Sequence, residues 1–167
     1  MAEITWAMWN CSGILPTSSA KEKIDFLKSC LNPNIDILIL IEIHHKLLGE
    51  ISPLLHAHLK NSLVRQTEAS KGDPYAGIVV SISERLTLLN HATLIPGRLL
   101  NFKIKCLQKC YNITAFYGYT SKNVSQEKIK FMTEQLTKHH NSSENNIILG
   151  DFNFVDNDLD RINQTKS

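Results

Sequence analysis

The sequence predicts a single α/β domain in which helices pack against the faces of β-sheets. Strand-like apolar runs and stretches of helical periodicity occur in the order strand, helix, strand, helix, four strands, helix, strand. The chain has 167 residues, 43% of them hydrophobic and 20% charged, which is enough for one substantial core. Because no internal repeat or low-complexity linker divides it, we expect one domain over residues 1–167.

Strands and helices alternate in the first half of the chain. Residues 4–10 are bulky and β-rich, and they predict a buried strand. A capping-box pattern at residues 19–22 opens a helix that is expected to reach residue 30. The nearly continuous apolar run at residues 35–41 is typical of a strand buried on both faces. A second helix is expected over residues 46–60.

The second half of the chain predicts mainly strands. After a turn at residues 72–74, strands are expected over residues 75–82, 87–93, 99–106 and 111–117. Apolar residues at helical spacing predict a helix over residues 125–139. Residues 145–151 then form a strand that ends in an aspartate.

Composition excludes several function classes. The longest apolar run is too short to cross a bilayer, so we expect no membrane partner. The N-terminus lacks a basic segment followed by a long apolar stretch, which favours an intracellular protein. A net charge of +2 does not by itself indicate nucleic-acid binding. The cysteines lack zinc-like spacing and are expected to be reduced and mostly buried: Cys11, Cys30, Cys106 and Cys110.

Oxygen-rich side chains follow three of the expected strands. Asn10 follows the first strand, Glu42 the second, and Asp151 with Asn153 the last. Functional groups often gather where strands leave the core, and carboxylate and amide oxygens are ligands that suit Mg²⁺. Each residue alone also has a plainer interpretation, such as a turn residue for Asn10 or a solvated charge for Glu42. Together they predict a site, with their oxygens within about 10 Å of each other.

Short motifs follow one another along the chain in a specific order. They are Trp9-Asn10-Cys11-Ser12-Gly13, Ile41-Glu42-Ile43-His44, Tyr75-Ala76-Gly77-Ile78-Val79-Val80, Phe116-Tyr117-Gly118, Gly150-Asp151-Phe152-Asn153 and Leu159-Asp160-Arg161. This series resembles the endonuclease/exonuclease/phosphatase family, and most of all the apurinic-endonuclease-like domain of LINE-type non-LTR retrotransposons. The resemblance implies a four-layer α/β sandwich of the DNase I-like type. It also implies a DNA-nicking endonuclease that uses Mg²⁺, with Mn²⁺ as a substitute.

The resemblance also implies roles for individual residues. Glu42 matches the metal-binding glutamate, and Asn10 matches the amide that helps to hold the metal. His44 matches a histidine at the phosphate-binding rim, although His44 and His45 can also be read as two solvated histidines after a strand. Tyr117 matches the tyrosine that approaches the scissile phosphate.

Two further matches complete this set. Asp151 matches the aspartate that orients or deprotonates the attacking water. Asn153 matches the amide that binds phosphate and stabilises charge in the transition state.

The chain departs from the family pattern in three places. Ile-Glu-Ile-His replaces Gln-Glu-Thr-His, which removes hydrogen-bonding groups beside Glu42. Phe-Tyr-Gly-Tyr-Thr replaces the commoner Ile-Tyr-Ala-Pro-Asn around Tyr117. The family's terminal Ser-Asp-His is absent from this sequence. We therefore expect a domain that lacks its C-terminal strands, an unfinished sheet edge near residues 147–149, and little or no nicking by the 167-residue chain.

Other functions remain open at this stage. One is a phosphomonoesterase or phospholipase of the same superfamily, since one fold hosts several chemistries. Another is a catalytically inactive module that keeps the fold and binds a ligand. The nuclease interpretation implies DNA as partner, nuclear location when acting on it, a reverse transcriptase segment in the parent element, and a missing C-terminal segment that completes the domain.

Overall fold

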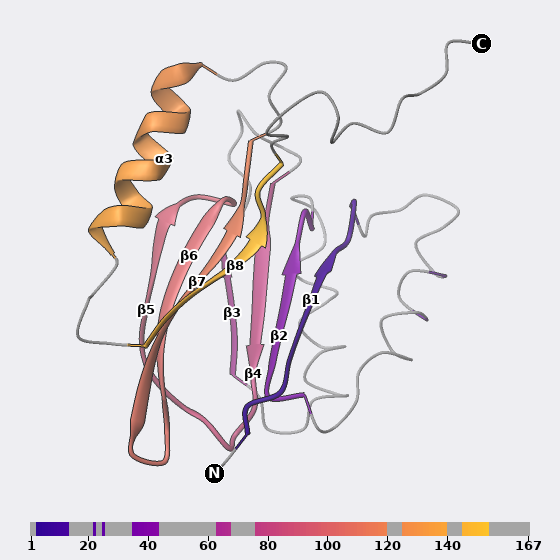
Figure 1. The fold of residues 1–167 in the computed structure, drawn as a ribbon. Coiled ribbons are helices and arrows are strands. Elements are labelled where there is room, and N and C mark those ends of the chain that lie inside the picture. Colours follow the sequence, from indigo (N-terminus) through magenta and orange to yellow (C-terminus); the bar gives the residue numbers. More distant parts are fainter. Residues whose placement is uncertain are drawn as a thin grey trace, which may run out of the picture.

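In a computed structural model, two four-stranded sheets pack face to face (Figure 1). The structure describes residues 3–13, 22, 25, 35–43, 63–67, 76–119, 125–139 and 145–153, with the backbone alone for 63–67. The elements are β1 (Trp6–Asn10), β2 (Ile37–Ile41), β3 (Leu63–Thr67), β4 (Ile78–Ile82), β5 (Thr87–Ile95), β6 (Leu99–Cys106), β7 (Lys109–Tyr117), α3 (Gln126–Lys138) and β8 (Asn145–Asp151).

Each sheet combines a parallel pair at one edge with antiparallel strands elsewhere. The first sheet has the order β1-β2-β4-β3 and the second has the order β5-β6-β7-β8. β1 pairs with β2 in parallel, and β7 pairs with β8 in parallel. Across the interface β1 contacts β8, and β2 contacts β7. The two parallel pairs therefore lie opposite each other in the sandwich.

The main core fills the space between the sheets. It joins alternate residues of β2 and β4 to Phe102 and other side chains of β6 and β7. All five residues of β2 are buried, so the prediction of a strand buried on both faces is confirmed. The helix predicted over 125–139 is also confirmed, because α3 begins after the N-cap Ser125 and packs against the second sheet through Met132.

The sequence-based description of the first strand was partly wrong. β1 begins at Trp6, and both Trp6 and Met8 are exposed, where burial was expected. The reason is that β1 lies at an edge of its sheet among the described strands, so its bulky residues are covered less than those of β2. β3 was not predicted at all, and it pairs antiparallel with β4.

Several other expectations fall wholly or partly outside the described residues. Of the helix expected to end at residue 30, only Glu22 and Asp25 are described, and both are helical. The helix at 46–60 and the turn at 72–74 lie outside. The described cysteines are free thiols, and Cys30 is outside. No helix within the described part of the chain is both long and apolar enough to cross a membrane.

The second sheet has an edge at β8, which contacts β1 of the first sheet. β8 is the last described strand of the second sheet, and Ile148 is exposed on it while Ile147 and Leu149 pack against the core. An apolar side chain is therefore exposed at the edge where one was expected. The incomplete domain remains a prediction.

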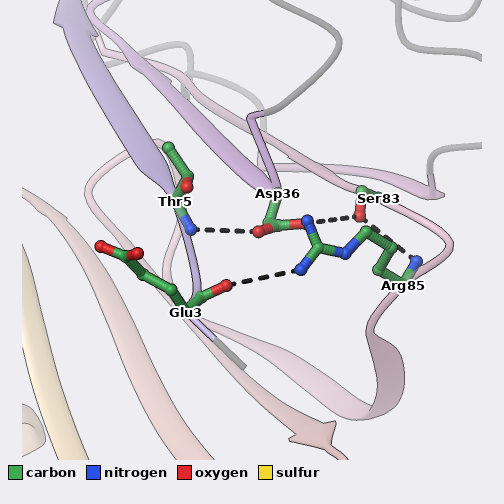
Figure 2. Close-up of polar contacts among 5 residues, drawn as sticks. All are labelled: Glu3, Thr5, Asp36, Ser83 and Arg85. Atoms are coloured by element: carbon green, nitrogen blue, oxygen red, sulfur yellow. Dashed lines mark hydrogen bonds and ion pairs between the residues drawn. The ribbon is translucent and has the colours of Figure 1, made fainter. Parts of the chain in front are cut away.

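A buried carboxylate ties strands together at the start of β2 (Figure 2). Asp36 is 2% exposed, and its oxygens accept hydrogen bonds from the Thr5 backbone nitrogen (3.0 Å) and the Ser83 hydroxyl (3.1 Å). Arg85 adds an ion pair at 3.3 Å and donates to the Glu3 carbonyl. This group, the Asp36 cluster, connects the segments that precede β1 and β2 with the turn that follows β4.

Candidate active site

Four strands end at the same end of the sandwich. β1, β2, β7 and β8 run in one direction, with their C-terminal ends together in Figure 1. In register, Asn10 lies beside Ile41 and Tyr117 beside Asp151. This topology brings together residues that are far apart in the sequence.

The Asp151 carboxylate is held by two nitrogen donors. The Asn10 side-chain amide donates to Asp151 Oδ2 at 3.0 Å, although the two residues are 141 positions apart. The orientation of this amide is fixed, because Asn10 Oδ1 accepts the Ser12 backbone N–H at 3.0 Å. The other carboxylate oxygen accepts the Asn153 backbone N–H at 3.0 Å. Both oxygens therefore have fixed directions.

Asn153 is anchored to the end of β7. Its side-chain nitrogen donates to the Gly118 carbonyl at 3.0 Å, and the Gly118 N–H donates to the Asp151 carbonyl at 2.6 Å. The strands are so close here that a Cβ at Gly118 would overlap the Phe152 carbonyl, and a Cβ at Gly150 would overlap the Phe116 carbonyl. Glycine is therefore required at both positions.

Glu42 adopts a left-handed backbone conformation at the end of β2, with φ 57°. Its carbonyl accepts the Gly13 N–H at 2.8 Å, and the neighbouring Ile43 N–H donates to Gly77. Of the described non-glycine residues with positive φ, all but Leu107 lie at this end of the sandwich: Ser12, Glu42 and Asn153. Such backbone conformations are uncommon and often occur at functional sites.

The isoleucines beside Glu42 have a clear structural role. Ile41 and Ile43 are both fully buried. These two side chains therefore contribute to packing in the core. Their positions do not provide polar support for the Glu42 carboxylate.

Tyr117 connects Glu42 with the rest of the site. Burial raises the pKa of Tyr117 to about 12, aided by the negative charge of Glu42, a hydrogen bond with Glu42 and the charge of Asp151, while Arg98 opposes this shift. At neutral pH the hydroxyl is therefore protonated and can donate a hydrogen bond. The Glu42 and Asp151 carboxylates both act on this one hydroxyl.

The structure thus brings together all the predicted site residues that it describes. These are Asn10, Glu42, Tyr117, Asp151 and Asn153. His44 and the motif at 159–161 lie outside the described residues. The roles assigned to individual residues remain predictions. Sequence reasoning missed Arg98, whose guanidinium lies over the Tyr117 ring with Cζ 4.2 Å from the centroid.

The donor set is suited to a hard divalent cation. In the described part of the chain, no three His, Cys, Asp or Glu side chains form a group that could hold a metal. Mg²⁺, however, commonly takes one or two protein carboxylates and completes its coordination with water and phosphate. Glu42 and Asp151 provide two carboxylates, and Asn10 Oδ1 adds a neutral amide oxygen, which is also a hard ligand. The residues present therefore fit Mg²⁺ or Mn²⁺.

An apolar cavity of about 290 Å³ lies beside the site, between α3 and the ends of β7 and β8. Phe152, which stands between Asp151 and Asn153, lines it and is 43% exposed. Its ring packs against Phe116, with centroids 4.9 Å apart. The exposed Phe152 ring thus lies on the α3 side of the second sheet, together with Phe116.

Solved structures with a similar overall fold identify the architecture. D. rerio TDP2 complexed with single strand DNA product has a TM-score of 0.70 and 20% identity over 92% of this chain and 62% of that chain. The human Nocturnin catalytic domain with bound sulfate anion has a TM-score of 0.62 and 18% identity, over 90% of this chain and 65% of that chain. ANGEL2, a 2',3'-cyclic phosphatase, has a TM-score of 0.61 and 15% identity, over 80% of this chain and 42% of that chain.

The chain has the DNase I-like fold. The predicted fold class is confirmed, because these neighbours are DNase I-like members of the endonuclease/exonuclease/phosphatase superfamily. The chain spans less than two thirds of the length of each of these three neighbours. No family model and no curated protein sequence matches it. At such low identity, likeness of DNase I-like folds establishes architecture alone.

Proposed function

We propose that this chain carries a site for metal-dependent hydrolysis of phosphodiesters, with DNA as its substrate. The observation that carries the proposal is the Asn10–Asp151 hydrogen bond of 3.0 Å, which joins the two sheets at the ends of four strands. It fixes a carboxylate beside a second acid, Glu42, and a protonated tyrosine. This arrangement suits attack by water on a phosphate ester.

Each residue can contribute a definite step. Asp151, held by the Asn10 and Asn153 nitrogens, orients a water and accepts its proton as the water oxygen bonds to phosphorus. The bond from phosphorus to the leaving oxygen breaks in the same displacement, and the leaving oxygen takes a proton from solvent. The amide hydrogen of Asn153 that does not bond Gly118 can donate a hydrogen bond to a phosphate oxygen, and the Tyr117 hydroxyl can do so in place of its hydrogen bond with Glu42.

Glu42 and Asn10 Oδ1 would hold the cation. A bound Mg²⁺ supplies charge neutralisation at the phosphate oxygens. Slow turnover is expected from this chain, because the isoleucines beside Glu42 give its carboxylate no hydrogen bonds.

A retrotransposon-type DNA-nicking endonuclease is the specific form that we favour. The order of the motifs supports it. The DNA product bound by the TDP2 neighbour is consistent with a nucleic-acid substrate. In this proposal the protein acts in the nucleus, and a reverse transcriptase segment of the same element uses the nick.

A phosphatase is the second candidate, because ANGEL2 with the same fold is a 2',3'-cyclic phosphatase. Fold does not distinguish the two, so substrates must. A catalytically inactive module of the same fold is the third.

The test combines metal binding with cleavage. Mn²⁺ binding is measured by calorimetry, and nicking is measured on supercoiled plasmid with Mg²⁺. We expect Glu42→Gln to weaken Mn²⁺ binding by about tenfold or more, and Asp151→Asn to lower nicking on the order of 10². Glu84→Gln is the matched control, since Glu84 is an exposed acid in the turn between β4 and β5.

Each outcome separates the candidates. Metal and DNA binding without cleavage would favour the inactive module. Hydrolysis of p-nitrophenyl phosphate or a 2',3'-cyclic nucleotide in preference to plasmid would favour a phosphatase. Wild-type protein that neither binds Mn²⁺ nor cleaves any of these substrates would refute the proposed function.

A further inference from the structure

Arg98 is a buried cation next to the candidate active site. It follows Gly97 in the turn between β5 and β6, and it is 7% exposed. Burying a charged side chain is costly unless the surroundings compensate it. The contacts of Arg98 should therefore show what its burial achieves.

The guanidinium of Arg98 grips the end of β7. Its Nη1 donates to the Gly118 carbonyl at 2.6 Å and approaches the Tyr117 carbonyl at 3.4 Å. In return, the Tyr117 N–H donates to the Arg98 carbonyl at 2.9 Å. Backbone and side chain of Arg98 thus both hold the segment that carries Tyr117.

The same guanidinium lies over two aromatic rings. Its Cζ is 4.2 Å from the centroid of the Tyr117 ring and 4.7 Å from that of Tyr119. A planar cation on an aromatic face is attracted by the ring, and more strongly when the pair is desolvated. The direction of the Tyr117 ring, and hence of its hydroxyl, is fixed by this stacking.

The segment held by Arg98 also anchors the other half of the site. The Gly118 carbonyl accepts Arg98 Nη1 and the Asn153 side-chain nitrogen together. The Gly118 N–H donates to the Asp151 carbonyl. A shift of this segment would therefore move Tyr117 relative to Glu42 and Asn153 relative to Asp151.

We infer that Arg98 is a positioning residue of the candidate active site. It fixes Tyr117 against Glu42, and through the Gly118 carbonyl it fixes Asn153. Because Arg98 is only 7% exposed, we expect it to act through these residues and not by contact with a substrate. The inference rests on the proposed function for its effect on metal binding and cleavage, but the positioning itself is measurable without either.

The first test measures position directly. Protein labelled with ¹³Cζ-tyrosine and ¹⁵N gives signals for Tyr117 and for the Asn153 side-chain amide, assigned with Tyr117→Phe and Asn153→Asp. We expect Arg98→Ala and Arg98→Lys to shift or broaden both signals. Lysine keeps the charge, but its ammonium group has no flat face that can stack on the rings while it donates to a carbonyl. Arg85→Met is the matched control and should leave both signals unchanged.

The second test measures Mn²⁺ affinity in the same variants. We expect a loss of about 10- to 100-fold in Arg98→Ala, as for other groups that orient metal ligands. Millimolar methylguanidinium should restore part of that affinity by filling the space left by the side chain. A merely structural role would not respond to this addition once the variant is folded.

The outcomes are distinguishable. If wild-type protein binds no Mn²⁺, the proposed function fails, and the two signals still decide the role of Arg98. If Arg98→Ala does not fold, Arg98→Lys supplies the comparison. Unchanged Tyr117 and Asn153 signals in a folded Arg98 variant, with wild-type Mn²⁺ affinity where the wild type binds the ion, would overturn the inference.

Discussion

Strand β2 is flanked by an acidic residue at each end, and the two carboxylates have different surroundings. Asp36, before the strand, is 2% exposed. In the Asp36 cluster it accepts hydrogen bonds from a backbone N–H and a hydroxyl and forms an ion pair with Arg85 (Figure 2). Glu42, after the strand, is only partly buried, has a left-handed backbone and faces a tyrosine. The two acids lie six positions apart, one just before β2 and one just after it.

This difference separates structural from functional charge. The oxygens of Asp36 are committed to donors that tie β1, β2 and β4 together, so the cluster contributes to folding. Glu42 is held in an uncommon backbone conformation next to another acid, an arrangement that folding alone does not favour. We therefore expect substitutions at the two ends of β2 to affect different measurements.

The largest expected effect is on stability at the Asp36 cluster. Asp36→Ala leaves the Thr5 N–H and the Ser83 hydroxyl without their partner, which costs on the order of 3 kcal/mol. The free energy of unfolding from urea titration measures this loss. Mn²⁺ affinity of the folded variant should stay at the wild-type value. A tenfold loss of affinity at unchanged stability would reverse the comparison.

The next effect is on alkaline stability at the site. The pKa of Tyr117 is about 12 in the folded protein and about 10 when exposed, so folding favours the protonated form. This contribution is complete below pH 10 and is lost as the pH rises through 12, on the order of 2 kcal/mol. In EDTA, Tyr117→Phe should lose less stability than the wild type between pH 10 and 12. Parallel curves for the two proteins would contradict the prediction.

A smaller effect with the opposite sign is expected at Glu42. Glycine adopts a φ of 57° without the steric penalty of a side chain, so Glu42→Gly should raise the free energy of unfolding by about 1 kcal/mol. The same variant should lose Mn²⁺ binding. Glu42→Gln separates the two effects, because it removes the charge and keeps the strained backbone. A Glu42→Gly protein that is less stable than Glu42→Gln would count against strain at this position.

The smallest effect is expected at Arg85. Its side chain is 61% exposed, so solvent screens its ion pair with Asp36, and Arg85→Met should cost only about 0.5 kcal/mol. Thermal unfolding at low and high salt measures the difference. High salt should reduce the gap between wild type and variant. A loss as large as that of Asp36→Ala would mean that the ion pair, and not the hydrogen bonds, holds the cluster.

Local patterns predicted those features that depend on local sequence. The apolar run of β2 and the helical spacing of α3 were confirmed, since burial on both faces and amphipathicity are visible in neighbouring residues. The meeting of Asn10 with Asp151 followed from strand ends, which parallel pairing brings together. These features needed no knowledge of distant contacts beyond the motif order.

Other features depend on contacts between distant residues. The exposure of Trp6 follows from the edge position of β1, and no property of residues 6–10 encodes that position. β3 carries no clear alternation, so its pairing with β4 was missed. Arg98 was missed because its partners are backbone carbonyls and rings about twenty positions away, and a carbonyl leaves no trace in a sequence.

The close approach of the β7 and β8 backbones at two glycines limits how the sequence can vary. Gly118 faces the Phe152 carbonyl, and Gly150 faces the Phe116 carbonyl, so each glycine makes room for the other strand's main chain. No exchange of side chains elsewhere can compensate a Cβ that overlaps a main-chain atom. In a library of random variants, both codons should therefore remain glycine under selection for folding alone, whichever residue replaces Asp151. Selection for catalysis would add Asp151 to that invariant set, and comparing the two selections would separate the residues that build this corner from those that use it.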